Sequence, residues 1–269
     1  MIGQPEIVSD SIMRQSARAS WNRLPSTFDW RIWGPFCATI AHLRDGHGMH
    51  RKSWEFATCI QGLDALLPPR PEFKAFATGA GCERPLYHYA NVVLEMHATD
   101  LYDLSHPEGQ PSMLSNPSAH APFPFRESHL FVQRMDGRNL DFRDGQFDFG
   151  FSLSSIEHFG TREEQRHAFS EMIRVTRPGG VLCVVTELIL NDARHEEYFS
   201  PEELNEVFFT DPRVKLVGGE PDLRVQQSLF DYPCDLRDSE NVDKSPHLVL
   251  TDGQVIWTSF SMFFQRLED

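Results

Sequence analysis

Short apolar runs alternate with amphipathic stretches along most of this chain. The apolar runs have strand length and are bounded by turn residues; they lie at residues 74–78, 92–96, 129–135, 147–153, 181–186, 214–217 and 255–264. Between several of them, apolar side chains recur at helical spacing, as in residues 86–90 and 162–175. Strands that alternate with helices are typical of a doubly wound α/β fold. We therefore predict a Rossmann-like sheet with helices on both faces.

Two helix starts are marked by their polar residues. Thr161 is followed three residues later by Glu164, which is the pattern of a capping box. Ser200 precedes Pro201 and Glu203, and this order is also typical of a helix N-terminus. The sequence thus predicts one helix that begins just after Thr161 and a second over residues 203–209.

The N-terminal part of the chain is organised differently. Residues 1–28 are polar and weakly periodic, which predicts a mobile arm or a lid. Two apolar stripes follow and predict two helices; their members are Trp30, Trp33, Phe36, and then Phe56, Ile60 and Leu63. These helices either cover the sheet edge or close over a ligand, and Lys52–Glu55, with Trp54, is the segment expected to close. We expect residues 1–70 to form one unit with the domain of residues 71–269.

A glycine loop is the strongest candidate for a binding site. Gly79-Ala80-Gly81 follows the first predicted strand, and Asp100 stands 21 residues after Gly79, at the end of the next one. Small residues let the backbone turn and approach a ligand, and a carboxylate at that distance can accept hydrogen bonds from ribose hydroxyls. The pattern predicts adenosine binding, with a tight turn in another α/β protein as the alternative.

The same loop departs from the dinucleotide pattern. Arg84 stands where the third glycine of that pattern is expected, and Glu83 places a negative charge where a pyrophosphate would lie. An adenosine that carries an amino acid, with its ammonium group, tolerates an acid at this position. The loop therefore favours such a ligand over a nicotinamide dinucleotide.

Composition narrows the class of protein. The chain has 269 residues, of which 40% are hydrophobic, and a formal net charge of −14. That charge argues against nucleic acid as a partner, because phosphate binding needs a basic face. The sequence contains no run of 18 apolar residues, so we expect no membrane span. Its first residues also lack the apolar segment of a signal peptide. Five scattered cysteines are typical of reduced thiols in a cytoplasmic protein, with no disulfide frame and no metal site expected.

The motifs together resemble the class I S-adenosylmethionine-dependent methyltransferases. The resemblance covers about residues 50–265 and rests on these segments: ATGAGCE (77–83), ATDLYD (98–103), RMDG (134–137), FDFGFSLSSIEHFG (147–160) and EMIRVTRPGGVLCVVTE (171–187). It is similar to a bacterial branch with a GAG-x-E loop and an SSIEHFG segment. The resemblance implies a seven-stranded sheet whose last strand, residues 255–264, is antiparallel. It also implies S-adenosylmethionine as the cofactor.

The resemblance assigns a role to each matching position. Gly79, Ala80 and Gly81 would contact the methionine part of the cofactor, and Glu83 would face its ammonium group. Glu83 occupies the third small position of the usual loop, which leaves its contact open. Asp100 would bind the ribose, and Leu101 would pack on the adenine. Asp136 and Gly137 would face the adenine amine, and Ser154 would lie beside the sulfur.

Methyl transfer needs little from the protein beyond alignment. A hydroxyl acceptor usually also needs a base, for which His158 is the best-placed candidate and Glu157 the alternative. Both could instead be capping and packing residues. We expect a small-molecule or sugar acceptor, methylated at oxygen. A catalytically silent S-adenosylmethionine-binding protein remains an alternative. A nicotinamide-dependent oxidoreductase is disfavoured, because the short-chain type needs a Tyr-x-x-x-Lys pair and none of the four lysines has a Tyr four residues before it.

Overall fold

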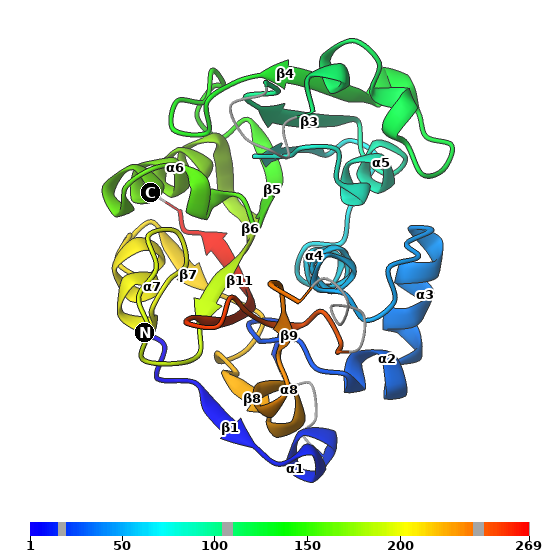
Figure 1. The fold of residues 1–269 in the computed structure, drawn as a ribbon. Helices are drawn as coiled ribbons and strands as arrows, with labels where there is room; N and C mark the ends of the chain where they lie inside the picture. The colour runs from blue at the N-terminus through cyan, green and yellow to red at the C-terminus, as the bar shows by residue number, and fades with distance from the viewer. Residues whose placement is uncertain (16–19, 104–109, 239–244, 269) are drawn as a thin grey trace.

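A mixed sheet with helices on both faces forms the centre of the molecule (Figure 1). The computed structural model describes residues 1–15, 20–103, 110–238 and 245–268. The nine-stranded sheet has the order β4-β3-β2-β5-β6-β11-β10-β9, and β7 also pairs with β11. A two-stranded parallel sheet joins β1 to β8.

The helices and strands have the following bounds. The strands are β1 (Glu6–Val8), β2 (Lys74–Thr78), β3 (Glu95–Asp100), β4 (Leu130–Arg134), β5 (Phe147–Leu153), β6 (Thr176–Ile189), β7 (Val214–Leu216), β8 (Arg224–Gln226), β9 (Cys234–Asp235), β10 (Val249–Thr251) and β11 (Ile256–Arg266). The α-helices are α1 (Asp10–Gln15), α2 (Phe28–Ile32), α3 (Gly34–His42), α4 (Arg51–Leu66), α5 (Arg84–Ala90), α6 (Arg162–Val175), α7 (Pro201–Phe208) and α8 (Gln227–Asp231). Short 3-10 turns are η1 (Pro111–Leu114), η2 (Pro117–His120), η3 (Glu127–His129) and η4 (Ile156–His158).

The predicted Rossmann-like, doubly wound fold is confirmed. Strands β4, β3, β2, β5 and β6 are parallel neighbours, and β11 runs antiparallel to β6. The sheet is wider than the seven strands predicted, because β9 and β10 extend its edge beside the first residues of β11. Parallel order brings the carboxyl ends of β2, β3, β5 and β6 to one edge, where ligands bind in such sheets.

Each face of the sheet has its own apolar core. Helices α4 and α5 pack on one face in a core that includes Phe36, Ile60 and Val185. Helices α6 and α7 pack on the other face, in a core that includes Phe169 and Phe264. Both capping boxes are present: Thr161 caps α6 with Glu164, and Ser200 caps α7 with Glu203.

The described part of the N-terminal segment is packed against the fold and does not project as an arm. Asn22 is fully buried; its Nδ2 donates to the carbonyl oxygens of Val217 and Gly219, and its Oδ1 accepts from the backbone N–H of Phe263. In Figure 1, β1 and α1 lie beside β8 and α8. A polar sequence misled the prediction because these buried polar groups find backbone partners.

Several element boundaries differ from those predicted. Helix α4 begins at Arg51, because the His50 side chain caps it by accepting from the backbone N–H of Lys52. Strand β6 begins at Thr176, five residues before the apolar run of residues 181–186, so that the RPGG segment lies within it. Residues 220–246 are mostly polar, yet their described part contains β8, α8 and β9. In the proline-rich stretch of residues 105–127, residues 105–109 lie outside the described part of the chain.

Candidate active site

The glycine loop after β2 has a backbone that only glycine adopts easily. Gly79 and Gly81 have φ angles of 61° and 46°, in the left-handed region. A Cβ on Gly79 would overlap the side chain of Ser155, whose hydroxyl donates to the Gly79 carbonyl oxygen over 2.8 Å. A Cβ on Gly81 would meet nothing within 4 Å. The loop is thus closed on the Gly79 side and open on the Gly81 side.

Asp100, at the end of β3, is tied to this loop. Its Oδ2 accepts from the backbone N–H of Gly81 over 3.0 Å, and its Oδ1 accepts from the backbone N–H of Tyr102 over 3.1 Å. Each carboxylate oxygen has two lone pairs, so each can still accept a hydrogen bond from a ligand hydroxyl. Leu101, next to Asp100, is an exposed large apolar residue with 45% of its surface accessible.

Beside the loop lies a buried group of charges centred on Lys52. The Lys52 ammonium nitrogen is 3.0 Å from Glu55 Oε2 and 3.4 Å from Glu83 Oε1, and it donates to the Leu153 carbonyl oxygen over 3.0 Å. Burial acts to lower the pKa of Lys52, but the Glu55 and Glu83 carboxylates raise it, and the net shift is upward. Lys52 therefore stays charged inside the protein.

The two acids that contact Lys52 have opposite shifts. Burial raises the pKa of Glu83 to about 8, despite Lys52, and the nearby Glu55 charge adds to the rise. Burial also acts to raise the pKa of Glu55, but Lys52 and Arg51 outweigh it and lower the value. Glu83 Oε2 is buried without a hydrogen-bond partner among the described residues. A ligand with N–H donors would supply that partner.

Ser154, at the end of β5, connects this group to the sheet edge. Its φ of 49° is unusual for a residue with a side chain, and such strain is common at functional sites. Its hydroxyl donates to Glu55 Oε1 over 2.9 Å, and the Ser259 hydroxyl of β11 donates to the same oxygen over 2.6 Å. Glu55 thus joins α4, β5 and β11.

Glu157 and His158 differ in their surroundings, although they are adjacent in η4. Glu157 is 1% exposed, its Oε2 accepts from the Thr186 hydroxyl over 3.0 Å, and its Oε1 lacks a partner in the described structure. Burial, together with the Glu187 charge, raises the pKa of Glu157 to about 7. His158 is partly exposed, and its Nδ1 lies 3.2 Å from Glu197 Oε1.

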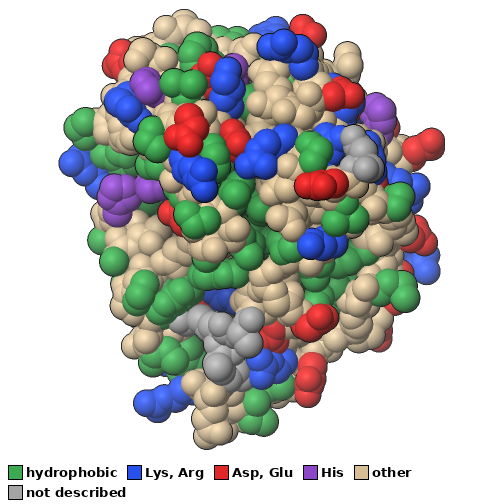
Figure 2. Space-filling view, turned by 180° about the vertical axis from the view of Figure 1, so that it is seen from behind, with side chains coloured by type: hydrophobic (Ala, Val, Ile, Leu, Met, Phe, Trp, Pro, Cys, Tyr) green, Lys and Arg blue, Asp and Glu red, His purple; other side chains and the backbone are tan. Residues whose placement is uncertain are grey.

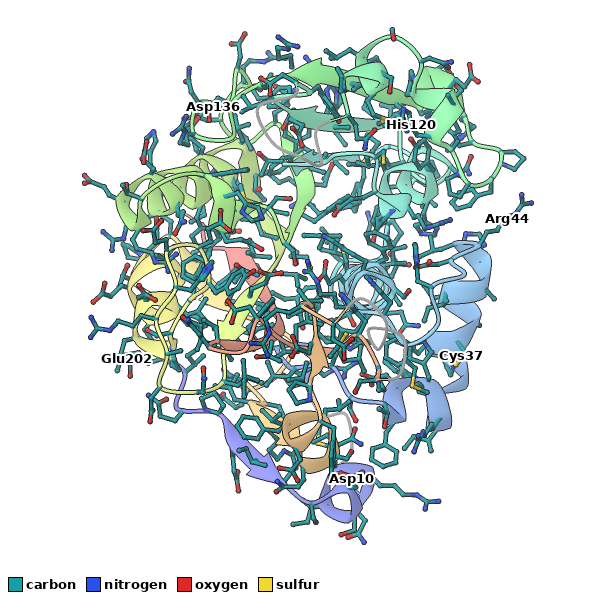
Figure 3. All side chains as sticks on the ribbon, in the orientation of Figure 1. Asp10, Cys37, Arg44, His120, Asp136 and Glu202 are labelled. Carbon is teal, nitrogen blue, oxygen red and sulfur yellow. The ribbon has the colours of Figure 1, made fainter. Side chains whose placement is uncertain are left out.

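Other predicted residues lie in different settings. Asp136 forms a bidentate pair with Arg138, which also contacts Glu164 of α6; Figure 3 places Asp136 near that helix. Gly137 has no room for a side chain, because a Cβ would overlap Phe159 and Thr78. Trp54 is fully buried, and its Nε1 donates to Asp29 over 2.9 Å. Asp29 lies in the N-terminal segment and not in the glycine loop, so we leave Trp54 out of the proposed site.

Three charged residues of this region were missed by sequence reasoning. Glu187 is 3% exposed and pairs with Arg51. It follows the apolar run of residues 181–186, so the rule that selected Asp100, an acid at a strand's carboxyl end, could have found it. Arg51 and Glu197 had no such signal, because only the fold brings them to this edge.

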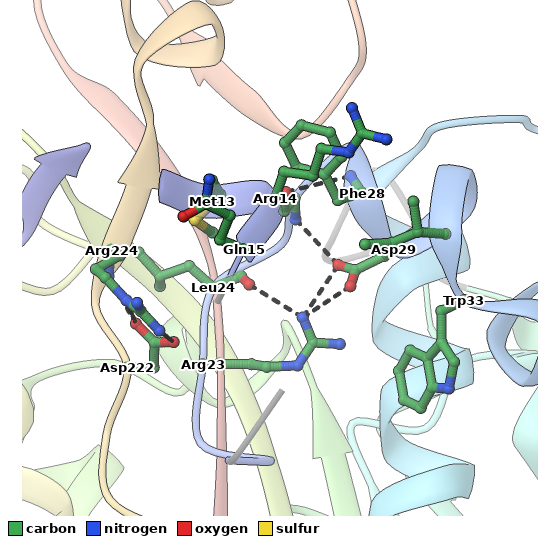
Figure 4. A pocket seen from close by; sticks show the side chains of 12 residues that line it. Met13, Arg14, Gln15, Arg23, Leu24, Phe28, Asp29, Trp33, Asp222 and Arg224 are labelled. Atoms are coloured by element: carbon green, nitrogen blue, oxygen red, sulfur yellow. Dashed lines mark hydrogen bonds and ion pairs between the residues drawn. The ribbon is translucent and has the colours of Figure 1, made fainter. Parts of the chain in front are cut away.

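A separate cavity of about 430 Å³ lies on the N-terminal side of the molecule (Figure 4). It is lined by side chains from the first 33 residues and by Asp222 and Arg224. Arg23 lines it and pairs with Asp29 over 3.0 Å. None of the predicted cofactor or catalytic residues lines this cavity.

Comparisons with known proteins agree with the predicted class. A family model described as a methyltransferase domain matches residues 79–184, from the glycine loop into β6. The structure of the SpnF cyclase superposes with a TM-score of 0.54 at 13% identity and covers all of both chains. Geranyl diphosphate methyltransferase, solved with GPP and sinefungin, gives a TM-score of 0.50 at 14% identity over 77% of each chain. The family match supports a methyltransferase domain over residues 79–184, and the two solved structures share the fold of this chain.

Similarity to curated sequences is confined to short segments. A mouse protein described as probable tRNA methyltransferase 9B is 47% identical over 53 residues, which are 20% of this chain and 12% of that protein. A rice protein described as probable chloroplastic tocopherol O-methyltransferase is 39% identical over 70 residues, 26% of this chain and 18% of that protein. The matched segment spans less than a fifth of the length of either relative.

Two features are absent from the described residues as a whole. No helix in them combines the length and apolar character needed to cross a membrane. No three His, Cys, Asp or Glu side chains in the same residues are placed to hold a metal ion. On the face seen in Figure 2, Lys and Arg side chains are interspersed with Asp and Glu.

Proposed function

We propose that this protein transfers a methyl group from S-adenosylmethionine to an oxygen of a small-molecule or sugar acceptor. The observation that carries the proposal is the glycine loop, in which the Gly81 N–H is held by Asp100 and the Gly81 side is open. The family model begins at this loop. The net charge of −14 and the interspersed charges of Figure 2 favour a small acceptor over nucleic acid.

The residues present fit this cofactor. The Gly79-Ala80-Gly81 backbone would border its methionine part, and Asp100 would accept from its ribose hydroxyls. The orphaned Glu83 Oε2 fits an ammonium group. The three N–H groups of Lys52 already contact Glu55, Glu83 and Leu153, so its charge would attract the cofactor carboxylate only at longer range. The remaining contacts are those implied by the family resemblance: Leu101 on the adenine, Asp136 and Gly137 at its amine, and Ser154 near the sulfur.

The proposed catalytic group is His158. S-adenosylmethionine would supply a methyl group on a cationic sulfur, and its transfer to a hydroxyl is an in-line displacement. His158 would take the hydroxyl proton on Nε2 when Nδ1–H donates to Glu197, an arrangement that fixes the tautomer of a histidine base. Glu157 is the alternative base, because its raised pKa near 7 also suits proton transfer.

Binding experiments separate this proposal from its rivals. Calorimetry should show one S-adenosylhomocysteine or S-adenosylmethionine per chain. Asp100→Ala should weaken binding by roughly 1.5–3 kcal/mol, because hydrogen bonds to a charged group are lost. Asp141→Ala, at an exposed carboxylate, is the matched control. Binding of NADH but of neither adenosyl ligand would contradict the proposal.

A turnover assay then tests catalysis itself. Release of S-adenosylhomocysteine should be screened against hydroxyl-bearing metabolites and sugars. Cofactor binding without turnover on any acceptor would favour a silent binding protein. Relatedness in fold to the SpnF cyclase makes this assay necessary, because a shared fold does not determine the reaction.

A further inference from the structure

Among the described residues, the proposed active site contains more buried carboxyl groups than cations. Four glutamate side chains lie there with Arg51 and Lys52; they are Glu55, Glu83, Glu157 and Glu187. His158, which can also carry a proton, lies near Glu157 and Glu187 and contacts the more exposed Glu197. A buried carboxylate without a partner costs several kcal/mol, on the order estimated for buried ions, so each needs a cation or a proton.

Two of the four carboxylates already have partners. Glu55 contacts both Lys52 and Arg51 and accepts from two serine hydroxyls. Glu187 forms an ion pair with Arg51. Glu83 contacts Lys52 more distantly, at 3.4 Å, and the proposed cofactor ammonium would complete its set.

Glu157 is the carboxyl group left over. Its Oε2 accepts from the Thr186 hydroxyl of β6, and its Oε1 is buried with no hydrogen-bond partner among the described residues. The residue is only 1% exposed, so the side chain lies inside the protein beside β6 and not toward solvent. It follows Ser154 by three residues, at the carboxyl ends of β5 and β6, where the acceptor is expected.

We propose that the acceptor carries an amine, and that its ammonium group binds the Glu157 carboxylate beside Glu187. This inference rests on the proposed function, and it refines the acceptor to an amino alcohol or an amino sugar. An ammonium group has three N–H donors and no acceptor, so it can satisfy Glu157 Oε1 and offset the negative charge of the pair. A neutral diol or sugar supplies donors but leaves the charge uncompensated.

Matched pairs of probes test the inference without knowledge of the natural acceptor. Ethanolamine is compared with ethylene glycol, and D-glucosamine with D-glucose, by NMR titration of protein saturated with S-adenosylhomocysteine. The amine of each pair should bind at least tenfold more tightly than its neutral partner. Glu157→Gln, which keeps an acceptor for Thr186 but removes the charge, should abolish this preference. Glu163→Gln, at an exposed carboxylate of α6, should retain it.

Other results would overturn the inference. Equal binding of amine and neutral probes would do so. No amine binding up to about 100 mM would also do so, because a dissociation constant above that concentration corresponds to very little binding free energy. An unchanged preference in Glu157→Gln would also contradict it. If that variant instead loses affinity for S-adenosylmethionine but not for S-adenosylhomocysteine, Glu157 serves the cationic sulfur and not the acceptor. Failure of wild-type protein to bind S-adenosylhomocysteine counts separately, against the proposed function.

Discussion

Glu83 is the residue whose protonation depends most directly on what binds beside it. Its pKa is raised to about 8 by burial, so the folded protein without ligand holds the proton at neutral pH. A cofactor ammonium favours the ionised carboxylate and would lower that pKa. Binding near pH 7 is then linked to the release of a proton, and affinity should rise as the pH increases toward 8.

This linkage can be measured as a heat. Calorimetric titration with S-adenosylhomocysteine near pH 7 in phosphate and in Tris, which differ in ionisation enthalpy, should reveal proton release of up to one per cofactor. Glu83→Gln should remove both the buffer dependence and the rise of affinity with pH. Identical heats in the two buffers for the wild-type protein would show that Glu83 does not face the ammonium.

His158 gives a second prediction at this scale. His158→Ala should lower turnover by roughly 10²–10⁴-fold, the usual contribution of a general base, with cofactor affinity almost unchanged. The pH–rate profile should lose the limb that a histidine base produces. Activity is measured as S-adenosylhomocysteine release with an acceptor found by the screen.

Glu197 provides the control for this assignment. Glu197→Gln should lower turnover less than His158→Ala, because the amide oxygen can still accept from Nδ1–H although the charge is lost. His167→Ala, at an exposed histidine of α6, should leave activity unchanged. Full turnover in His158→Ala would leave Glu157, or alignment alone, as the source of catalysis.

At the scale of elements, the contact between α4 and β11 determines how closely α4 approaches the sheet. Gly62 lies on α4 against Phe263, and a Cβ on Gly62 would overlap the buried Phe263 ring. Ala is the better helix former by about 1 kcal/mol, which opposes the effect of the overlap. Overpacking of a core costs typically ~1–3 kcal/mol, so the overlap should win.

Gly62→Ala should therefore lower the free energy of unfolding by ~1–2 kcal/mol, measured by urea denaturation. Gly46→Ala is the matched control, since a Cβ there meets nothing within 4 Å. An increase in stability in Gly62→Ala would mean that α4 moves freely on the sheet, contrary to the close packing described.

Elements with strong local signals were predicted well, and those set by tertiary contacts were not. The apolar runs and the Thr161 capping box located β2, β5 and α6 almost to the residue, whereas α7 begins two residues earlier than residues 203–209 indicated. Strand β3 begins at Glu95, later than residues 92–96 indicated, because the N–H groups of Val92 and Val93 still donate to Tyr89 at the end of α5. The edge strands β9 and β10 are two and three residues long, and only their partners hold them in the sheet.

At the scale of the whole molecule, sequence reasoning could name candidate residues that lie within one motif, and it missed those that come from distant segments. Gly79, Gly81 and Asp100 lie within one strand–loop–helix–strand unit, so sequence spacing relates them to one another. Arg51, Glu187 and Glu197 come from α4, β6 and the segment before α7, and only the folded chain brings Arg51 to Glu187 and Glu197 to His158. Chemistry that is spread over distant segments leaves no spacing to recognise.

The last prediction concerns residues 1–70, which we propose belong to the same unit as the sheet. Without them the sheet would lose α4, which buries one face of β5, β6 and β11 and carries Lys52 and Glu55. It would also lose Asn22, which hydrogen-bonds to the backbone of Val217, Gly219 and Phe263. A chain that starts at Pro71 would then expose a large part of its apolar core, and it should be insoluble or unable to bind S-adenosylhomocysteine. Solubility, circular dichroism and calorimetry on the shortened and full-length chains measure this directly. Normal folding and full cofactor affinity of the shortened chain would show that the N-terminal helices are an accessory cover and that Lys52 contributes nothing to cofactor binding.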